Sequence, residues 1–221
     1  TSPEVDVPGL LREDEANRSR HDIPYRIGHR MATDLSPATA GAWETLDDGS
    51  RVWRLSVASR DALWIVLGFD RFRIPDGAQL WVYDPALTTV HTYTSRNVRP
   101  HGQLWTPPIE GSTIVIELAW PASLAAVSPD LHLAAVSHGY KPFGTIGRDA
   151  ARERNGADGI GDSGACNIDV NCPLGALWQD QKRGVVILLS GGEGFCSASL
   201  INTTANDCRP YVLTAHHCGA G

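Results

Sequence analysis

The 221-residue sequence lacks any long hydrophobic run. Its longest apolar stretches, Ala62 to Phe69 and Val185 to Leu189, are far shorter than the ~20 residues that a membrane-spanning helix needs. It also has no long run of Lys or Arg, and its formal net charge is -6. Such a chain has no general attraction to phosphate backbones or anionic lipid. We therefore expect neither a nucleic-acid partner nor a membrane partner.

Cysteine is absent from the sequence before Cys166, and all five cysteines lie in the last quarter: Cys166, Cys172, Cys196, Cys208 and Cys218. This density is typical of a disulfide framework formed in an oxidising compartment. The odd count leaves at least one partner outside this chain or one thiol free. The first 20 residues have no apolar core of a secretory signal, but a removed signal leaves no trace, so its absence does not argue for the cytoplasm.

Regular strand patterns begin only near Trp43, so we expect residues 1–40, which are rich in charge, Pro and Ser, to form a loosely ordered arm. From there, short apolar alternations bounded by turn signals such as Asp48-Gly49 predict strands. They fall at residues 51–58, 62–69, 79–83, 90–94, 112–119 and 131–136. Short strands without helical periodicity between them predict an antiparallel β-sandwich at 41–140.

The stretch from Gly144 to Gly161 carries arginines and glycines but no apolar face. We assign residues 141–160 to an exposed linker and a site of proteolytic processing. Residues 161–221 then begin a second β domain, with strands expected at 184–190, 195–201 and 211–215, which this sequence does not complete. The predicted fold class is therefore all-β.

A histidine directly precedes a cysteine where the last predicted strand ends, in Thr214-Ala215-His216-His217-Cys218-Gly219. A general base must be held rigidly beside its nucleophile, and a disulfide at the next residue would fix the backbone that carries the imidazole. Cys196 is the expected partner of Cys218, because its strand is predicted to return alongside strand 211–215 as in a hairpin.

The same segment closely resembles the catalytic-histidine motif of trypsin-like serine proteases. Over residues 161–221 the chain is similar to the opening of mature bacterial lysyl endopeptidases, through Ser163-Gly164-Ala165-Cys166-Asn167-Ile168-Asp169-Val170-Asn171-Cys172-Pro173 and Asn202-Thr203-Thr204-Ala205-Asn206-Asp207. Upstream, Val52-Trp53-Arg54-Leu55 and Gly102-Gln103-Leu104-Trp105-Thr106 resemble the pro-region of that family more loosely.

This resemblance implies the precursor of a secreted bacterial serine endopeptidase that cleaves after Lys or another basic residue. Its β-sandwich would be a pro-region that assists and masks its own protease domain, followed by the start of a trypsin-like β-barrel. His217 would be the catalytic base, and His216 a neighbour without a proton-transfer role. The aspartate and serine of the triad are not among these residues, so we expect this chain alone to be inactive.

Three features depart from the family pattern. Ile160, rather than Lys, precedes Gly161, which leaves open processing by another protease or a specificity other than Lys. Cys208 is an additional cysteine whose partner is unknown. Cys166 and Cys172 would pair with cysteines beyond Gly221.

Two motifs have a second possible interpretation. Gly161-Asp162-Ser163-Gly164 looks like a nucleophile motif, but chymotrypsin-type enzymes have the chain order His, Asp, Ser, and Ser163 precedes His217. A metal site on His216, His217 and Cys218 would need three contiguous residues to close around one ion. We predict no metal and no cofactor.

A different class of function is a secreted binding module for carbohydrate or protein. The sandwich region contains six tryptophans, which are Trp43, Trp53, Trp64, Trp81, Trp105 and Trp120. Aromatic residues on strands mostly fill cores, whereas a sugar platform needs several of them exposed on one face. The protease interpretation, with peptide substrates, is therefore preferred.

Overall fold

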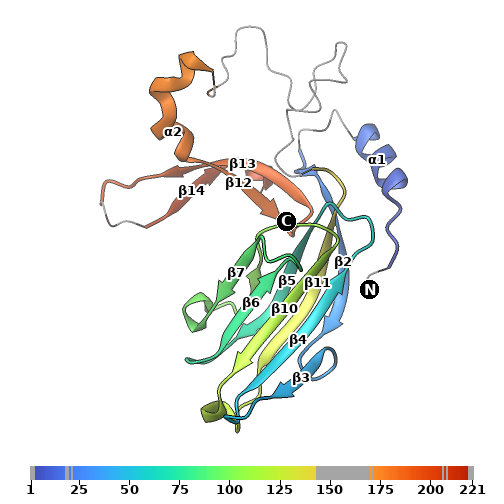
Figure 1. The fold of residues 1–221 in the computed structure, drawn as a ribbon. Helices are drawn as coiled ribbons and strands as arrows, with labels where there is room; N and C mark the ends of the chain where they lie inside the picture. The colour runs from blue at the N-terminus through green and yellow to red at the C-terminus, as the bar shows by residue number, and fades with distance from the viewer. Residues whose placement is uncertain are drawn as a thin grey trace. The chain divides into compact units, whose positions relative to one another are not determined.

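The computed structural model describes residues 3–17, 20, 22–142, 170, 172–205, 207 and 209–218. Most of the described elements are strands (Figure 1). The helices are α1 (Val7–Ala16) and α2 (Gln179–Arg183). The strands are β1 (Tyr25–Arg26), β2 (Gly28–Leu35), β3 (Ala42–Thr45), β4 (Arg51–Ala58), β5 (Trp64–Arg73), β6 (Gln79–Tyr83), β7 (Val90–Tyr93), β8 (Leu104–Trp105), β9 (Ile109–Glu110), β10 (Thr113–Trp120), β11 (Asp130–Gly139), β12 (Val185–Ser190), β13 (Gly194–Ile201) and β14 (Tyr211–Thr214). The all-β prediction is confirmed.

Two five-stranded antiparallel sheets form the β-sandwich. One has the order β3-β4-β10-β6-β7, and the other has the order β2-β11-β5-β8 with β9 also paired to β5. Strand β10 shows how the sequence pattern sets the layers, because every second side chain, from Ile114 to Trp120, is buried. Its other face carries Glu117, which forms an ion pair with Arg54 of β4 at 2.6 Å.

One hydrophobic core lies between the two sheets. Phe69 and Phe72 of β5 pack edge to face with ring centroids 6.3 Å apart, and Phe72 makes a similar contact with Tyr93 of β7. The cluster also includes Trp53 and Trp120 from the facing sheet, both at most 2% exposed. Burial of aromatic and aliphatic side chains from both sheets therefore stabilises this sandwich.

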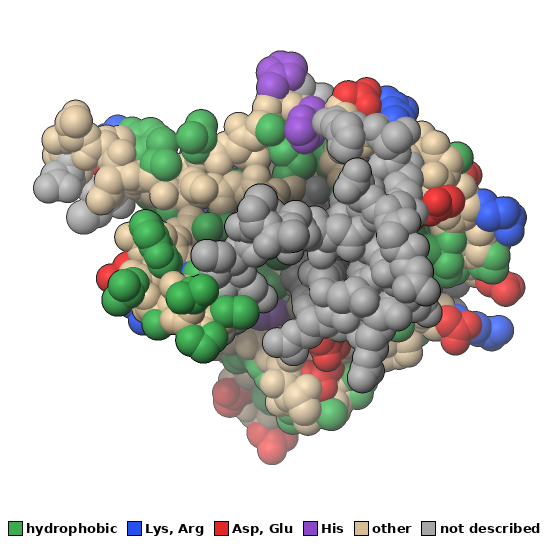
Figure 2. Space-filling view, turned by 90° about the horizontal axis from the view of Figure 1, so that it is seen from above, with side chains coloured by type: hydrophobic (Ala, Val, Ile, Leu, Met, Phe, Trp, Pro, Cys, Tyr) green, Lys and Arg blue, Asp and Glu red, His purple; other side chains and the backbone are tan. Residues whose placement is uncertain are grey.

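The remaining strands form a separate small sheet. Strands β12 and β13 are joined by a tight turn at residues 191–193, and β14 pairs with β13 farther along. Apolar side chains on these strands are exposed, including Ile187 at 51% and Leu213 at 62%. Figure 2 shows hydrophobic side chains at the surface on the face seen from above. Among the described residues, the side chains of β12 and β14 are all exposed or half-buried, so these strands are less covered than those of the sandwich.

Two compact units are formed, and neither is a continuous stretch of chain. The first contains residues 1–7, 28–141 and 191–193, and the second contains residues 8–27, 142–190 and 194–221. The sandwich belongs to the first unit, and strands β1, β12, β13 and β14 belong to the second. Among the described residues, no helix is long and apolar enough to cross a membrane.

The arm expected at residues 1–40 differs from the structure, which has α1, β1 and β2 in this range. Strand β2 runs antiparallel to β11 from Gly28 to Leu35, so the sandwich begins earlier than residue 41. Its sequence has few apolar residues, and hydrogen bonding to β11 stabilises a strand that its own pattern does not indicate. The linker expected at 141–160 lies, apart from Lys141 and Pro142, outside the described residues.

Candidate active site

The strand pair β13–β14 positions the two histidines. The strands run antiparallel, with Ile201 opposite Tyr211 and Ala198 opposite Thr214. The Thr214 hydroxyl donates a hydrogen bond to the Ser197 carbonyl at 2.9 Å. The chain then enters a short 3₁₀ turn at His216–Cys218, in which the Cys218 amide donates to the Ala215 carbonyl at 3.0 Å. The turn therefore begins from a fixed point on the sheet.

A disulfide fixes the far end of this turn. It joins Cys196 of β13 to Cys218, with the two Cα atoms 5.9 Å apart, and this is the pair that the sequence analysis joins. Cys196 is buried at 8% exposure, so the bond links the turn to the interior of the small sheet. His217 lies between two anchored points, Thr214 and Cys218. The backbone that carries its imidazole is thereby held in place.

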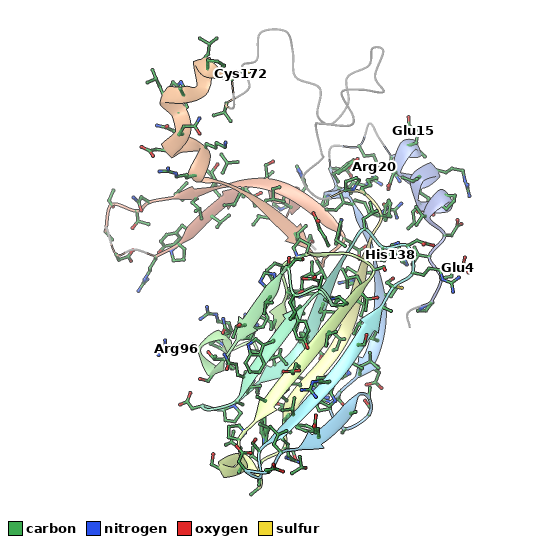
Figure 3. The ribbon with its side chains drawn as sticks, viewed as in Figure 1. Glu4, Glu15, Arg20, Arg96, His138 and Cys172 are labelled. Atoms are coloured by element: carbon green, nitrogen blue, oxygen red, sulfur yellow. A yellow bond between two sulfur atoms is a disulfide. The ribbon has the colours of Figure 1, made fainter. Side chains whose placement is uncertain are left out.

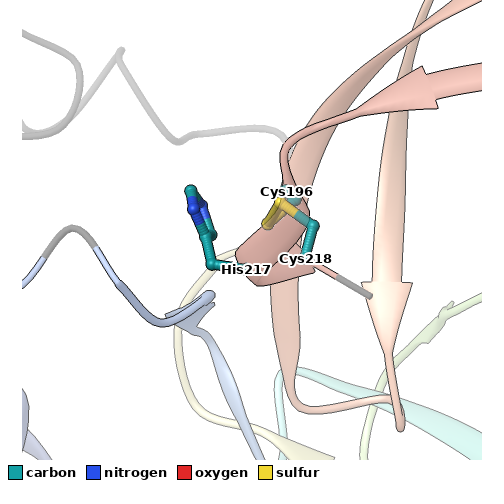
Figure 4. A group of neighbouring side chains, drawn as sticks. All are labelled: Cys196, His217 and Cys218. Carbon is teal, nitrogen blue, oxygen red and sulfur yellow. A yellow bond between two sulfur atoms is a disulfide. The ribbon is translucent and has the colours of Figure 1, made fainter. Parts of the chain in front are cut away.

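The imidazole of His217 points away from the disulfide (Figure 4). The side chain is half-buried, whereas that of His216 is exposed. The side-chain ligand atoms of Cys196, His217 and Cys218 lie within 4.8 Å of one another, a spacing that would suit a metal ion. Both sulfurs are consumed by the disulfide, however, and metals bind cysteine as the thiolate. The disulfide therefore leaves the imidazole of His217 as the one side chain of this group of three that is free to take part in chemistry.

A charged pair from the N-terminal segment belongs to the same compact unit as His217. Arg20, labelled in Figure 3, donates to the Asp22 carboxylate through Nη2 at 2.7 Å and Nε at 3.0 Å. This hydrogen bonding is the main reason that the pKa of Asp22 falls to about 2, and the charge of His217 makes a smaller contribution in the same direction. Asp22 is therefore ionised at neutral pH and within electrostatic reach of His217.

Sequence reasoning missed Asp22. It lies in the region expected to be a loosely ordered arm, and the strand that follows it, β1, is only two residues long. A two-residue strand has no periodicity to detect. The segment is recognisable only through its pairing with β13, which the sequence pattern does not reveal.

Several residues singled out in the sequence lie outside the described part of the structure. They are Ser163, Cys166 and Cys208, and the start of the second domain at residue 161. Cys172, labelled in Figure 3, is exposed and forms no disulfide with a described residue. The partners that the resemblance implies for Cys166 and Cys172 stay a prediction, and the resemblance assigns no partner to Cys208.

The sandwich tryptophans have mainly structural roles. Trp53, Trp64 and Trp120 are at most 2% exposed. Their indole N–H groups donate to backbone carbonyls of Ala40, Lys141 and Leu124 at 2.8 to 2.9 Å. A buried indole whose N–H is satisfied by the backbone has no group left to bind sugar. Trp105, at 39%, is the most exposed of the six, and one ring alone does not make a carbohydrate platform.

Comparison with known proteins gives matches along most of the chain. Residues 4–140 match the family model described as lysyl endopeptidase N-terminal domain. Residues 160–221 match the model described as lysyl endopeptidase, C-terminal domain. The chain is also similar to a lysyl endopeptidase of Pseudomonas aeruginosa, with 25% identity over 204 residues. That alignment covers 87% of this chain and 42% of the relative, so the chain spans less than half of the relative's length.

Proposed function

Because the chain belongs to the lysyl endopeptidase family, we propose that it is part of the precursor of a secreted serine endopeptidase whose general base is His217. The observation that carries the proposal is the anchored turn at His216–Cys218. Its disulfide to Cys196 lies in the range that matches the C-terminal domain of the family. A base held rigidly beside its nucleophile is the requirement of acyl transfer by a serine.

In this mechanism the His217 imidazole takes the proton of a serine hydroxyl as that oxygen attacks a peptide carbonyl. The imidazolium then gives the proton to the leaving amine. An aspartate at the other ring nitrogen holds the tautomer that accepts the proton. We expect this aspartate and the serine in sequence that follows Gly221. Residues 1–221 alone would then have no peptidase activity.

The two parts of the chain have different roles in this proposal. Residues 1–160 are a pro-region that assists folding and masks the catalytic site, and residues 161–221 are the first part of the catalytic domain. Asp22 supports the masking role, because it lies within electrostatic reach of His217. Processing takes place in the segment 141–160, where Arg152 and Arg154 provide basic cleavage sites.

The substrates proposed are proteins and peptides cleaved after Lys or another basic residue. The name of the Pseudomonas aeruginosa relative supports lysine. The enzyme acts outside the cell, which agrees with the disulfide between Cys196 and Cys218, because such bonds persist in oxidising compartments.

Replacing His217 by alanine in the full-length gene product should abolish cleavage of lysyl and arginyl amide substrates. Removal of the base from a Ser-His-Asp triad lowers kcat by roughly 10⁴-fold or more. The matched control is His216→Ala, which removes the adjacent exposed imidazole and should leave most of the activity. The preferred amide substrate identifies the specificity.

Equal activity of the parent and the His217→Ala protein would refute the assignment of the base. Loss of activity in His216→Ala, with retention in His217→Ala, would move the role to the neighbouring histidine.

A further inference from the structure

The turn between β12 and β13 lies against the sandwich. Residues 191–193 belong to the same compact unit as residues 28–141. The Gly28 amide donates to the Glu193 carbonyl at 3.0 Å, and the Ser137 hydroxyl donates to the Gly191 carbonyl at 3.3 Å. Arg30 lies 3.3 Å from the Glu193 carboxylate. Both backbone and side-chain groups of β2 and β11 therefore hold this turn.

The fit at the centre of the turn is close enough to require glycine. Gly192 has a φ of +75°, and a Cβ there would lie 2.5 Å from the Ser137 hydroxyl oxygen and 3.2 Å from the Trp105 ring. The Trp105 ring is itself held down on Gly68, where a Cβ would lie 2.6 Å from it. The sheet surface under the turn is therefore shaped by small residues and one tryptophan.

The neighbouring glycine provides a contrast. Gly191 also has a positive φ, +58°, but a Cβ there would meet only the end of the Arg30 side chain, at 2.9 Å. A flexible arginine can move aside, whereas Ser137 is a fully buried residue of β11. Substitutions at these two adjacent positions therefore have different expected effects, although the backbone conformation is similar.

Strand β1 pairs with the same hairpin. Tyr25 lies opposite Phe195, and Arg26 lies opposite Gly194. These two residues of β13 directly precede Cys196 in the sequence. Arg26 is held by α1, because its guanidinium donates to Asp14 at 2.8 Å and to Glu13 at 3.0 Å. Addition of an extended segment to a sheet edge is a common mode of peptide recognition, in which main-chain hydrogen bonds supply affinity.

We propose that the β12–β13 hairpin is the element through which the N-terminal region recognises the catalytic domain. The surface formed by β2, β11 and Trp105 receives the turn Gly191–Glu193, and β1 extends the edge of β13. This inference rests on the proposed function, which makes these two regions a pro-region and a catalytic domain. A two-stranded hairpin is marginally stable by itself, so a bound pro-region stabilises it before the rest of the domain folds.

The contact is tested by Gly192→Asn in residues 1–221, with Gly191→Asn as the matched control. Asn tolerates positive φ better than other residues with side chains, so both variants keep the turn conformation at similar cost. Hydrogen exchange of the Gly28 amide, which donates to Glu193, is the measurement. We expect exchange about tenfold faster or more in Gly192→Asn and within about twofold of the parent in Gly191→Asn.

A rescue variant separates direct contact from misfolding. Adding Ser137→Ala removes the hydroxyl oxygen nearest to the new side chain and should restore part of the protection in Gly192→Asn. An unchanged exchange rate of the Gly28 amide in Gly192→Asn would overturn the proposal.

The role in recognition is tested in the full-length gene product by the yield of processed protein. Gly192→Asn should lower this yield about tenfold, whereas Gly191→Asn should stay close to the parent. If the Gly28 amide exchanges faster in Gly192→Asn but the yields of processed protein are equal, the contact contributes only to packing, and the proposal is overturned. Absence of peptidase activity in every protein, the parent included, would instead count against the proposed function, while the exchange result would stand.

Discussion

His138 of β11 is buried in the sandwich at 1% exposure, and its Nδ1 lies 2.8 Å from the hydroxyl oxygen of Ser59. No described group forms a hydrogen bond with its Nε2. Burial is the main reason that the pKa of His138 is lowered, and the nearby His29 lowers it further. The imidazole is therefore neutral in the folded protein at neutral pH, and protonation would place an unpaired charge in the interior.

The stability of the sandwich should consequently fall as the pH falls below about 6.5, the ordinary pKa of histidine. Below this pH the unfolded chain binds a proton at residue 138 that the folded chain does not bind. The free energy of unfolding in urea, followed by tryptophan fluorescence between pH 7.5 and 5.5, measures the effect. His138→Gln should make the free energy of unfolding less dependent on pH. The reduction corresponds to at most one proton, or about 1.4 kcal/mol per pH unit.

His132 acts in the opposite direction. Hydrogen bonds to Asp70 and then to Asp34 raise its pKa, so its contribution to stability is present at low pH and is lost as the pH rises through its folded pKa. The pH dependence of the free energy of unfolding of the parent therefore contains both effects. Only the difference between the parent and His138→Gln gives the contribution of the buried histidine. His216→Gln, an exposed position, is the control. Identical slopes for the parent and His138→Gln would contradict the assignment.

The disulfide is the feature of greatest consequence at the scale of strands and turns. It closes 22 residues of chain that include part of β13 and all of β14. Replacing Cys196 and Cys218 together by serine should destabilise this sheet by about 3 kcal/mol, because the unfolded chain regains the freedom that the bond removes. Hydrogen exchange of the β14 amides measures the loss.

Cys172→Ser is the matched control, since Cys172 forms no disulfide with a described residue. Exchange in the sandwich strands should remain the same in both proteins, because the disulfide belongs to the other compact unit. Unchanged protection of β14 in the double serine variant would mean that the turn carrying His217 is held by the sheet alone.

Strands with strong alternation could be predicted from sequence, and strands stabilised by their partners could not. The bounds expected for β4 and β6 agree with the structure, and β10 is shifted by one residue, because these segments are rich in Val, Ile, Leu and Trp and are bounded by turn residues. Strand β2 has a similar length but a mixed sequence, and it exists because β11 pairs with it. Helix α1, with Pro8 and Gly9 in its first turn, also gave no clear signal.

The candidate site divides in the same way. The pair Cys196 and Cys218 could be inferred because Cys196 lies on β13 and Cys218 lies in the turn that directly follows the neighbouring strand β14, which is local information. Asp22 and β1 could not be inferred, since more than 150 residues separate them from β13, and contacts at such a distance leave no periodic pattern.

For the whole molecule, residues 1–221 purified alone should not hydrolyse lysyl or arginyl amides. Catalysis of this kind requires serine, histidine and an oxyanion hole in one structure, and an incomplete triad retains at most about 10³ to 10⁴ over water even when that hole is present. Release of chromogenic amine above a blank, in proportion to chain concentration and resistant to His217→Ala, would point to a contaminant. Release that His217→Ala abolishes would show that this chain already holds a complete site.

In the proposed protease precursor, the disulfide would also set the time at which the protein becomes active. In a reducing cytosol the bond between Cys196 and Cys218 cannot persist, so a newly made chain would carry His217 on a turn fastened at one end only. In an oxidising medium the disulfide forms, and the turn is then held at both ends. Under the proposed function, export would therefore complete the positioning of His217, and the thiols of the cytosol would protect the producing cell before any pro-region is cut.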